Sequence, residues 1–252
     1  MARKLLISVV VGALLAGCAT DTDEARTSAT SSSPTPAAHS GPVAIELPHL
    51  PSQGFVVEEW GGLTFLGIDG GSLYRLEGYR LYYEWTVPGP VIVRRGKAFY
   101  LLDVSRHVLK PFDSPQAASA AAPQFQDGLE LPLPPHPAGT EMSGLWAYAL
   151  RSPDGKEVLA QWSGECEVPT AFLIVHGVPR PVTGEPNLSA TPPNSVALGW
   201  SARGDALVYL QPNDACGQKR EPGIYAFRGP GNGKLLYPVH TIRSEARMWG
   251  SG

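Results

Sequence analysis

The sequence predicts an all-β fold of short antiparallel strands. The 252 residues include 25 prolines and 28 glycines, and these separate short runs rich in Val, Ile, Leu, Tyr, Phe and Trp. Such a pattern is typical of many short strands joined by turns. Helix signals are scarce, and two stretches in the C-terminal half repeat one another at a fixed offset. Repetition of this kind is typical of folds built from copies of one small sheet.

The first 17 residues are expected to be a signal peptide that lies outside the fold. Arg3 and Lys4 precede a mostly apolar run at 5–17, whose length of about 13 residues is below the roughly 20 needed for a permanent membrane helix. The run ends in Leu-Ala-Gly-Cys at 15–18, which resembles the lipobox of bacterial lipoproteins. This resemblance implies cleavage before Cys18 and a diacylglycerol on its thiol. An ordinary signal peptide with a chance cysteine, or an uncleaved anchor, is the alternative.

Residues 18–45 are expected to be the lipidated cysteine followed by a flexible tether. They are rich in Ser, Thr, Ala and Pro, so they cannot bury enough apolar surface to offset their chain entropy. Residues 46–252 are long enough for one domain with a sizeable core. The formal net charge is -3, without a basic patch, so nucleic acid is not expected as a partner. Membrane lipid at Cys18 is expected, which places the protein outside the cytoplasm on the cell membrane or outer membrane.

The N-terminal half of the domain contains several expected strands. Residues 61–78 and 97–112 each have the pattern of a strand, a turn and a strand. Residues 79–87 and 89–96 have the composition of two further strands of the second unit. Residues 114–128 are rich in Ala with proline near both ends, which predicts a loop or one short helix.

The C-terminal half contains two copies of one pattern. Ser152 and Gly155 in the first copy align with Ser201 and Gly204 in the second, an offset of 49 residues. Each copy has an alternating strand, a tight turn, a second strand, a polar loop with a cysteine, a third strand and a fourth apolar piece. Four antiparallel strands repeated about every 50 residues are typical of β-propeller blades.

The first copy resembles a known repeat family. Its turn, Ser-Pro-Asp-Gly-Lys at 152–156, is similar to that of the WD40-like (PD40) repeat of TolB-type propellers. The resemblance covers about 151–184 well and about 195–237 less closely, because Ala202 and Arg203 replace the Pro and Asp. It implies an all-β, propeller-like domain of about four four-stranded blades. Ring closure stays open at this point, because residues 239–250 could supply a closing strand or fray.

Four turn residues are interpreted as structural. Pro153 presets φ for the second position of a type I turn, Asp154 accepts bonds from nearby backbone N–H groups, and Gly155 takes the left-handed conformation that follows. Gly204 occupies the matching position of the second copy. The alternative is a calcium or catalytic role for Asp154, although one carboxylate is far from a coordination set.

The two remaining cysteines, Cys166 and Cys216, predict a disulfide. An even pair in an exported domain is typically oxidised, and two free buried thiols are the alternative. Both cysteines follow the second strand of their copies, so the disulfide is expected to join adjacent blades.

The predicted function is a non-enzymatic binding or scaffolding module of the cell envelope, with an envelope protein or glycan as its partner. No catalytic or metal-binding residue is assigned, no cofactor is expected, and the six histidines form no HxxH or HExxH pair. The six tryptophans are expected to pack between blades, with a role in lining a binding mouth as the alternative. An envelope hydrolase and a small-ligand receptor, each with a site at the propeller mouth, are the alternative functions.

Overall fold

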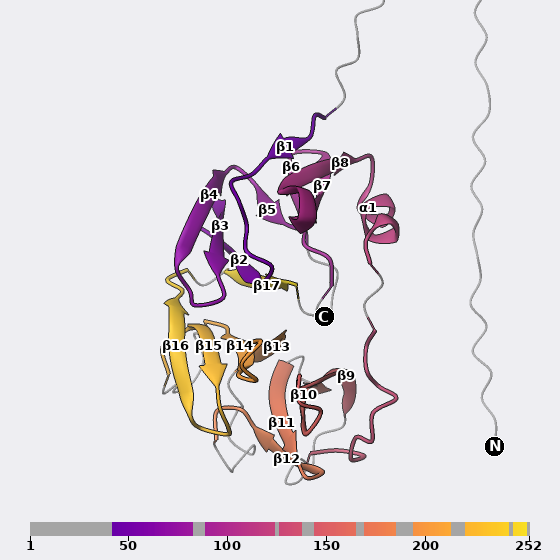
Figure 1. The fold of residues 1–252 in the computed structure, drawn as a ribbon, viewed down its shortest axis with the longest axis vertical. Coiled ribbons are helices and arrows are strands. Elements are labelled where there is room, and N and C mark those ends of the chain that lie inside the picture. The colour runs from indigo at the N-terminus through magenta and orange to yellow at the C-terminus, as the bar shows by residue number, and fades with distance from the viewer. Residues whose placement is uncertain are drawn as a thin grey trace, which may run out of the picture. The chain divides into compact units, whose positions relative to one another are not determined.

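The computed structural model describes residues 42–82, 89–123, 126–137, 144–164, 169–184, 194–212, 220–241 and 244–250. Within these residues the chain forms 17 β-strands in four antiparallel sheets, with one α-helix and one short 3₁₀ helix (Figure 1). The predicted all-β class is confirmed. No helix in these ranges is long and apolar enough to cross a membrane.

Two of the sheets, called I and II here, come from the first half of the domain and its last strand. Sheet I has the order β17 (Glu245–Trp249), β2 (Gly54–Glu59), β3 (Gly62–Gly67) and β4 (Ser72–Glu77). Sheet II has the order β1 (Ile45–Glu46), β8 (Val108–Phe112), β7 (Ala98–Asp103), β6 (Ile92–Arg95) and β5 (Arg80–Leu81), and the 3₁₀ helix η1 (Val104–Arg106) joins β7 to β8. The strands expected at 61–78, 89–96 and 97–112 are therefore present, and the described part of 79–87 contains the two-residue strand β5.

The other two sheets, III and IV, contain the two copies recognised in the sequence. Sheet III has the order β12 (Val178–Pro181), β11 (Pro169–Val175), β10 (Glu157–Gly164) and β9 (Gly144–Arg151). Sheet IV has the order β13 (Ser195–Trp200), β14 (Ala206–Leu210), β15 (Gly223–Phe227) and β16 (Gly233–Pro238). In both sheets, strands that follow each other in the chain are neighbours in the sheet.

The last strand, β17, pairs with β2 and so joins the two ends of the domain in one sheet. The pairing places Glu245 opposite Glu58 and Trp249 opposite Gly54. Glycine suits this position, because a Cβ on Gly54 would lie 2.3 Å from the Trp249 ring. The stretch at 239–250, for which the sequence left a strand or a frayed end open, therefore contains a paired strand.

Three pairs of sheets share buried apolar cores. Phe65 of sheet I packs with Val93 and Tyr100 of sheet II. The core between sheets I and IV contains Phe55 and Leu207, among others. The core between sheets III and IV contains the large side chains Tyr148, Leu173, Trp200, Tyr225 and Phe227. Each of these cores is filled by side chains from alternate positions along the strands, as expected of half-buried β-strands.

The connection between β8 and β9 covers one face of sheet II and one face of sheet III. Its helix α1 (Pro115–Ala121) begins at Ser114, whose hydroxyl accepts a bond of 3.1 Å from the Ala117 N–H, and has proline in its first turn. Ala118 of this helix packs with Ile92 and Leu101 of sheet II. Further along, Leu131 and Leu133 pack against the aromatic face of sheet III. The sequence predicted a loop or one short helix for the alanine-rich segment at 114–128, and α1 is such a helix.

Candidate functional site

A cavity of about 830 Å³ lies where strands of different sheets end. Its walls come from the ends of β9, β13 and β17, from the residues just before β6, and from the end of β7 with the turn that follows. Lys110 of β8, the end of α1 and the described part of the connection between α1 and β9 supply the remaining wall. The cavity therefore collects residues from four sheets and one long connection.

The inner walls of the cavity are apolar. Val91, Leu101, Met248, Trp200 and Trp249 all line it and are all buried within the domain. The two indole N–H groups are already bonded. That of Trp200 donates to the Leu150 carbonyl at 2.9 Å, and that of Trp249 donates to the Pro51 carbonyl at 3.0 Å. Because their N–H groups are occupied, the two rings offer only apolar surface to a molecule in the cavity.

The rim of the cavity is polar and partly charged. Lys110 Nζ lies 2.7 Å from the Asp103 carboxylate, which also accepts a bond of 2.7 Å from Ser105 Oγ and one of 3.2 Å from the Arg106 N–H. The bond from Lys110 and then the bond from Ser105 lower the pKa of Asp103 to about 2. Asp103 is therefore ionised at neutral pH, and the Asp103–Lys110 pair gives the rim a fixed dipole.

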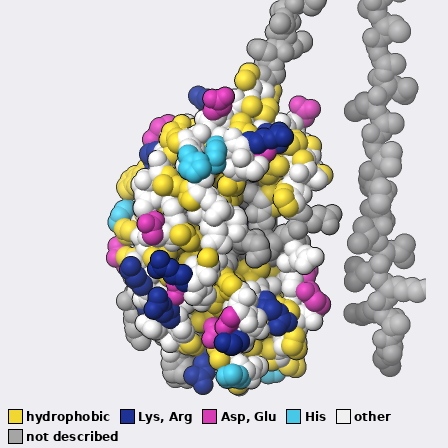
Figure 2. Space-filling model, viewed as in Figure 1, with side chains coloured by type: hydrophobic (Ala, Val, Ile, Leu, Met, Phe, Trp, Pro, Cys, Tyr) yellow, Lys and Arg dark blue, Asp and Glu magenta, His cyan; other side chains and the backbone are white. Residues whose placement is uncertain are grey.

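Charged side chains of both signs also occur elsewhere on the surface. Figure 2 shows Lys and Arg side chains interspersed with Asp, Glu and apolar side chains on the face in view. Gln126, Glu130 and Arg151 add further polar groups to the cavity itself. A molecule that fits this site would combine an apolar body with a polar end.

The four turn residues singled out in the sequence lie in hairpin turns, and none of them lines the cavity. Asp154 accepts bonds from Ser152 Oγ at 2.8 Å and from the Lys156 N–H at 3.2 Å, so its carboxylate is occupied within its own turn. Pro153 lies in the same turn. Gly155 and Gly204 have positive φ values of 75° and 80°, which glycine adopts without steric cost. Cys18, Cys166 and Cys216 lie outside the described residues, so their lipid and disulfide roles stay predictions.

A histidine pair that sequence reasoning missed joins the segment after β1 to the residue that ends η1. His49 Nδ1 and His107 Nε2 are 3.1 Å apart, and the Leu50 N–H donates to His107 Nδ1 at 3.2 Å. Since Nδ1 of His107 accepts that bond, its Nε2 must carry the proton and donate it to His49. The two rings are thus bonded to each other rather than arranged to hold a metal. In the described ranges no group of three or more His, Cys, Asp or Glu side chains could hold a metal ion.

A second titratable pair lies at the opposite end of β17 from the cavity. Glu245 and Glu58 are register partners on neighbouring strands. Burial, together with the charge on Glu58, raises the pKa of Glu245 to about 7, although Arg247 opposes the shift. Burial also raises the pKa of Glu58, while the Leu81 N–H, which donates to it at 2.8 Å, opposes that shift.

Because of this pair, the free energy of unfolding is expected to decrease as the pH rises from about 4.5 to about 7. A carboxyl group with a raised pKa in the folded state favours folding while it is protonated, and that contribution is lost as the pH rises through about 7. Glu245→Gln should therefore stabilise the protein at pH 8 more than at pH 5, by about 1–2 kcal/mol after allowance for partial exposure. Urea denaturation at the two pH values measures this, with the exposed Glu46→Gln as control. An equal effect of Glu245→Gln at both pH values would contradict the assignment.

Comparisons with known proteins add little to this geometry. No protein-family model and no curated protein matches the sequence. A solved structure described as a protein of unknown function from Bacteroides caccae aligns over 74% of this chain and 57% of its own, with 15% sequence identity and a TM-score of 0.18. The chain thus spans little more than half the length of that protein. A likeness at this level carries no argument about either fold or function.

Proposed function

We propose that this protein is a lipid-anchored, non-enzymatic binding module of the cell envelope and that its ligand site is the cavity at the strand ends. The lipobox-like sequence before Cys18 supports the anchor. Acyl chains contribute about 0.8 kcal/mol per buried methylene, so several chains on one cysteine would hold the protein on a membrane facing away from the cytoplasm.

We also propose that the four sheets are the blades of a TolB-type, propeller-like domain. Three features support this proposal: each sheet contains a run of four antiparallel strands, β17 returns to pair with β2, and three pairs of sheets share apolar cores. In such an arrangement β5, β9, β13 and β17 are the first strands of the four blades. The cavity then lies where three of these first strands, β9, β13 and β17, end.

The observation that carries the binding function is the cavity itself. Its volume of about 830 Å³ is in the range of small-molecule sites, which are typically apolar clefts with a few polar groups. The buried Trp200, Trp249 and Met248 would receive an apolar body, and the Asp103–Lys110 pair would fix a polar end. This favours a small-ligand receptor as the second candidate beside a module that binds an envelope protein or glycan.

The proposal is tested by photo-crosslinking in intact cells. A benzophenone amino acid in place of Arg151, at the cavity rim, should form an adduct, whereas the same amino acid in place of the exposed Lys234 on β16 should not. A small mass increase in the protein would identify a small-ligand receptor, and a shift to a larger species would identify a macromolecular partner. Equal adducts at both positions, or none at Arg151, would refute a binding role for the cavity.

The anchor is tested separately, so that its failure can be told from that of the binding site. An alkyne-bearing palmitate analogue should label the wild-type protein and should not label Cys18→Ser. The same substitution should move the protein from the membrane fraction to the soluble fraction. A wild-type protein without label would exclude lipidation and leave the proposed cavity function unaffected.

A further inference from the structure

Trp60 is held outward in a tight turn between β2 and β3. The residue is 66% exposed, and it is the one exposed residue among the Phe, Tyr and Trp of the described ranges. Glu59 pairs with Gly62, so Trp60 and Gly61 form a two-residue hairpin loop. Both have positive φ, 53° and 75°, which defines a type I′ turn.

Tryptophan is an unusual residue for this position. The first residue of a type I′ turn lies in the left-handed region, where Asn and Gly are favoured and a bulky side chain is strained. The same turn recurs at His176–Gly177, where φ is 51° and 77°. Histidine tolerates the left-handed region better than most residues. Backbone strain at an exposed residue is a reason to ask what the exposed ring binds.

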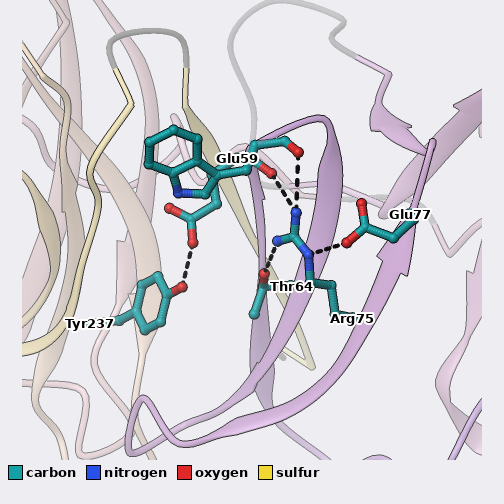
Figure 3. A network of polar contacts seen from close by, with 6 residues as sticks. Glu59, Thr64, Arg75, Glu77 and Tyr237 are labelled. Carbon is teal, nitrogen blue, oxygen red and sulfur yellow. Dashed lines mark hydrogen bonds and ion pairs between the residues drawn. The ribbon is translucent and has the colours of Figure 1, made fainter.

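Arg75 of β4 donates hydrogen bonds to the backbone of the turn that carries Trp60. Arg75 Nη2 donates to the carbonyls of Glu59 and Trp60, each at 3.2 Å, and Nη1 donates to Thr64 Oγ1 at 3.0 Å. Arg75 Nε donates to the Glu77 carboxylate at 2.5 Å. Figure 3 shows the guanidinium between Thr64 and Glu77, with dashed lines to two backbone carbonyl oxygens, those of Glu59 and of the first turn residue. These bonds fix the backbone that presents the indole ring.

A second contact fixes the same turn to the neighbouring sheet. Tyr237 of β16 donates a hydrogen bond to the Glu59 carboxylate, whose side chain is buried (Figure 3). Burial and then the Glu59 carboxylate raise the pKa of Tyr237 to about 12, so the phenol keeps its proton at neutral pH. Hydrogen bonds from Arg75 and from Tyr237 therefore fix the base of the turn on both sides. They hold the backbone of Trp60 in place at the surface.

The surface around the indole ring is open and polar. A Cβ on Gly61 or on Gly78 would meet no atom within 4 Å, so space is free beside the turn. The two glycines are adjacent, because the Gly78 N–H donates to the Gly61 carbonyl at 3.1 Å. The Glu77 side chain is 69% exposed, and the Arg75 side chain is 34% exposed. The turn that carries the indole has a carboxylate and a guanidinium beside it, because a Cβ on Gly62 would lie 3.0 Å from Glu77 Oε2 and 3.2 Å from Arg75 Nη2.

We propose that Trp60 is a stacking platform for a pyranose ring and that Glu77 and Arg75 bond the hydroxyls of that glycan. A pyranose has an apolar C–H face and polar edges, which matches an exposed aromatic ring on a turn that has a carboxylate and a guanidinium beside it. A protein interface would need a larger apolar area. An anionic membrane would find no net positive charge in the ion pair of Arg75 and Glu77.

This site is separate from the cavity. Trp60 follows the end of β2, whereas the cavity residue Trp249 pairs with Gly54 at its start. The strand between them has six residues, which corresponds to roughly 20 Å. The glycan site therefore does not depend on the ligand proposed for the cavity.

The test uses the full chain in detergent and isothermal titration calorimetry with two probes, chitotetraose and cellotetraose. The wild type should bind at least one of them, and Trp60→Asn should weaken that binding about tenfold or more. Because asparagine suits a type I′ turn, Trp60→Asn should also raise the midpoint of thermal unfolding by about 2–4 °C. A loss of binding that accompanies a gain of stability distinguishes a functional residue from a structural one.

Two further variants serve as controls. His176→Asn changes the matching turn of sheet III and should leave glycan binding unchanged. Glu77→Gln should weaken binding several-fold without the rise in the unfolding midpoint. The proposal is overturned if neither tetrasaccharide binds the wild type, if Trp60→Asn binds as well as the wild type, or if Trp60→Asn lowers the midpoint. It is also overturned if the wild type binds vesicles of phosphatidylcholine and phosphatidylglycerol and Trp60→Asn abolishes that binding rather than glycan binding.

Discussion

Deletion of residues 245–252 is expected to abolish cooperative folding of the domain. β17 lies between two cores: Ala246 and Met248 pack in the core shared by sheets I and IV, and Trp249 packs in the core shared by sheets I and II. All five residues of β17 pair with β2. Loss of two large buried side chains and of these backbone bonds should cost at least about 5 kcal/mol, which is comparable to the whole stability of a typical domain.

Near-ultraviolet circular dichroism and urea denaturation measure this effect. Deletion of residues 251–252 alone, which leaves β17 intact, is the matched control and should unfold like the wild type. Adding a synthetic peptide of residues 245–252 to the truncated protein should restore part of the signal, because the exposed edge of β2 is then paired again. A truncated protein with an unchanged urea midpoint would show that β17 contributes little.

Gln161→Leu is expected to destabilise the protein by about 3 kcal/mol. The buried Gln161 side chain of β10 bonds to the backbone of β13 in the neighbouring sheet. Its Oε1 accepts from the Ala197 N–H at 2.8 Å, and its Nε2 donates to the Ser195 carbonyl at 3.2 Å. Leucine has a similar volume but would leave both backbone groups buried without these partners, at about 1–3 kcal/mol each.

The same interface offers a graded series. The Tyr148 hydroxyl donates to the Ala197 carbonyl at 2.6 Å, so Tyr148→Phe should cost about 1 kcal/mol. Lys156→Leu, on the exposed turn of the same sheet, should change stability by less than about 0.5 kcal/mol. Urea midpoints should fall in the order Lys156→Leu, Tyr148→Phe, Gln161→Leu. A Gln161→Leu variant as stable as the wild type would show that β13 finds other partners.

The sequence predicted the strands of sheets III and IV well because their signals are local. Alternating large apolar residues mark each strand, and glycine at 155 and 204 marks the turn that follows. The sequence does not distinguish a strand from a frayed end at residues 239–250, because β17 pairs with β2, at the other end of the domain. A strand whose partner lies so far away carries no local sign of its pairing.

The sequence could not predict the candidate sites, because each site combines residues that are far apart in the chain. The cavity combines Val91, Lys110, Trp200 and Trp249, which have no common spacing in the chain. His49 and His107 likewise meet across 58 residues. The tryptophans were expected to pack between blades, with a role in lining a binding mouth as the alternative. Trp200 and Trp249 lie in cores shared by two sheets and also line the cavity. Trp146 and Trp162 pack between sheet III and the connection that contains Leu131 and Leu133. Trp60 is exposed, and Trp85 lies outside the described residues. A signal for Trp60 was present, since Trp-Gly stands where a hairpin turn favours Asn-Gly.

The pairing of β2 with β17 sets the order in which the domain can be completed. Sheet I lacks its β17 strand until the last described residues of the chain have been synthesised. Contacts between segments so distant in sequence form slowly and only after loop closure. If the chain is exported, as the proposed lipid anchor requires, sheet I would be completed only after residues 245–249 have crossed the membrane. The chain would then stay incompletely folded during translocation, and the pairing of β17 with β2 would be a late step of folding.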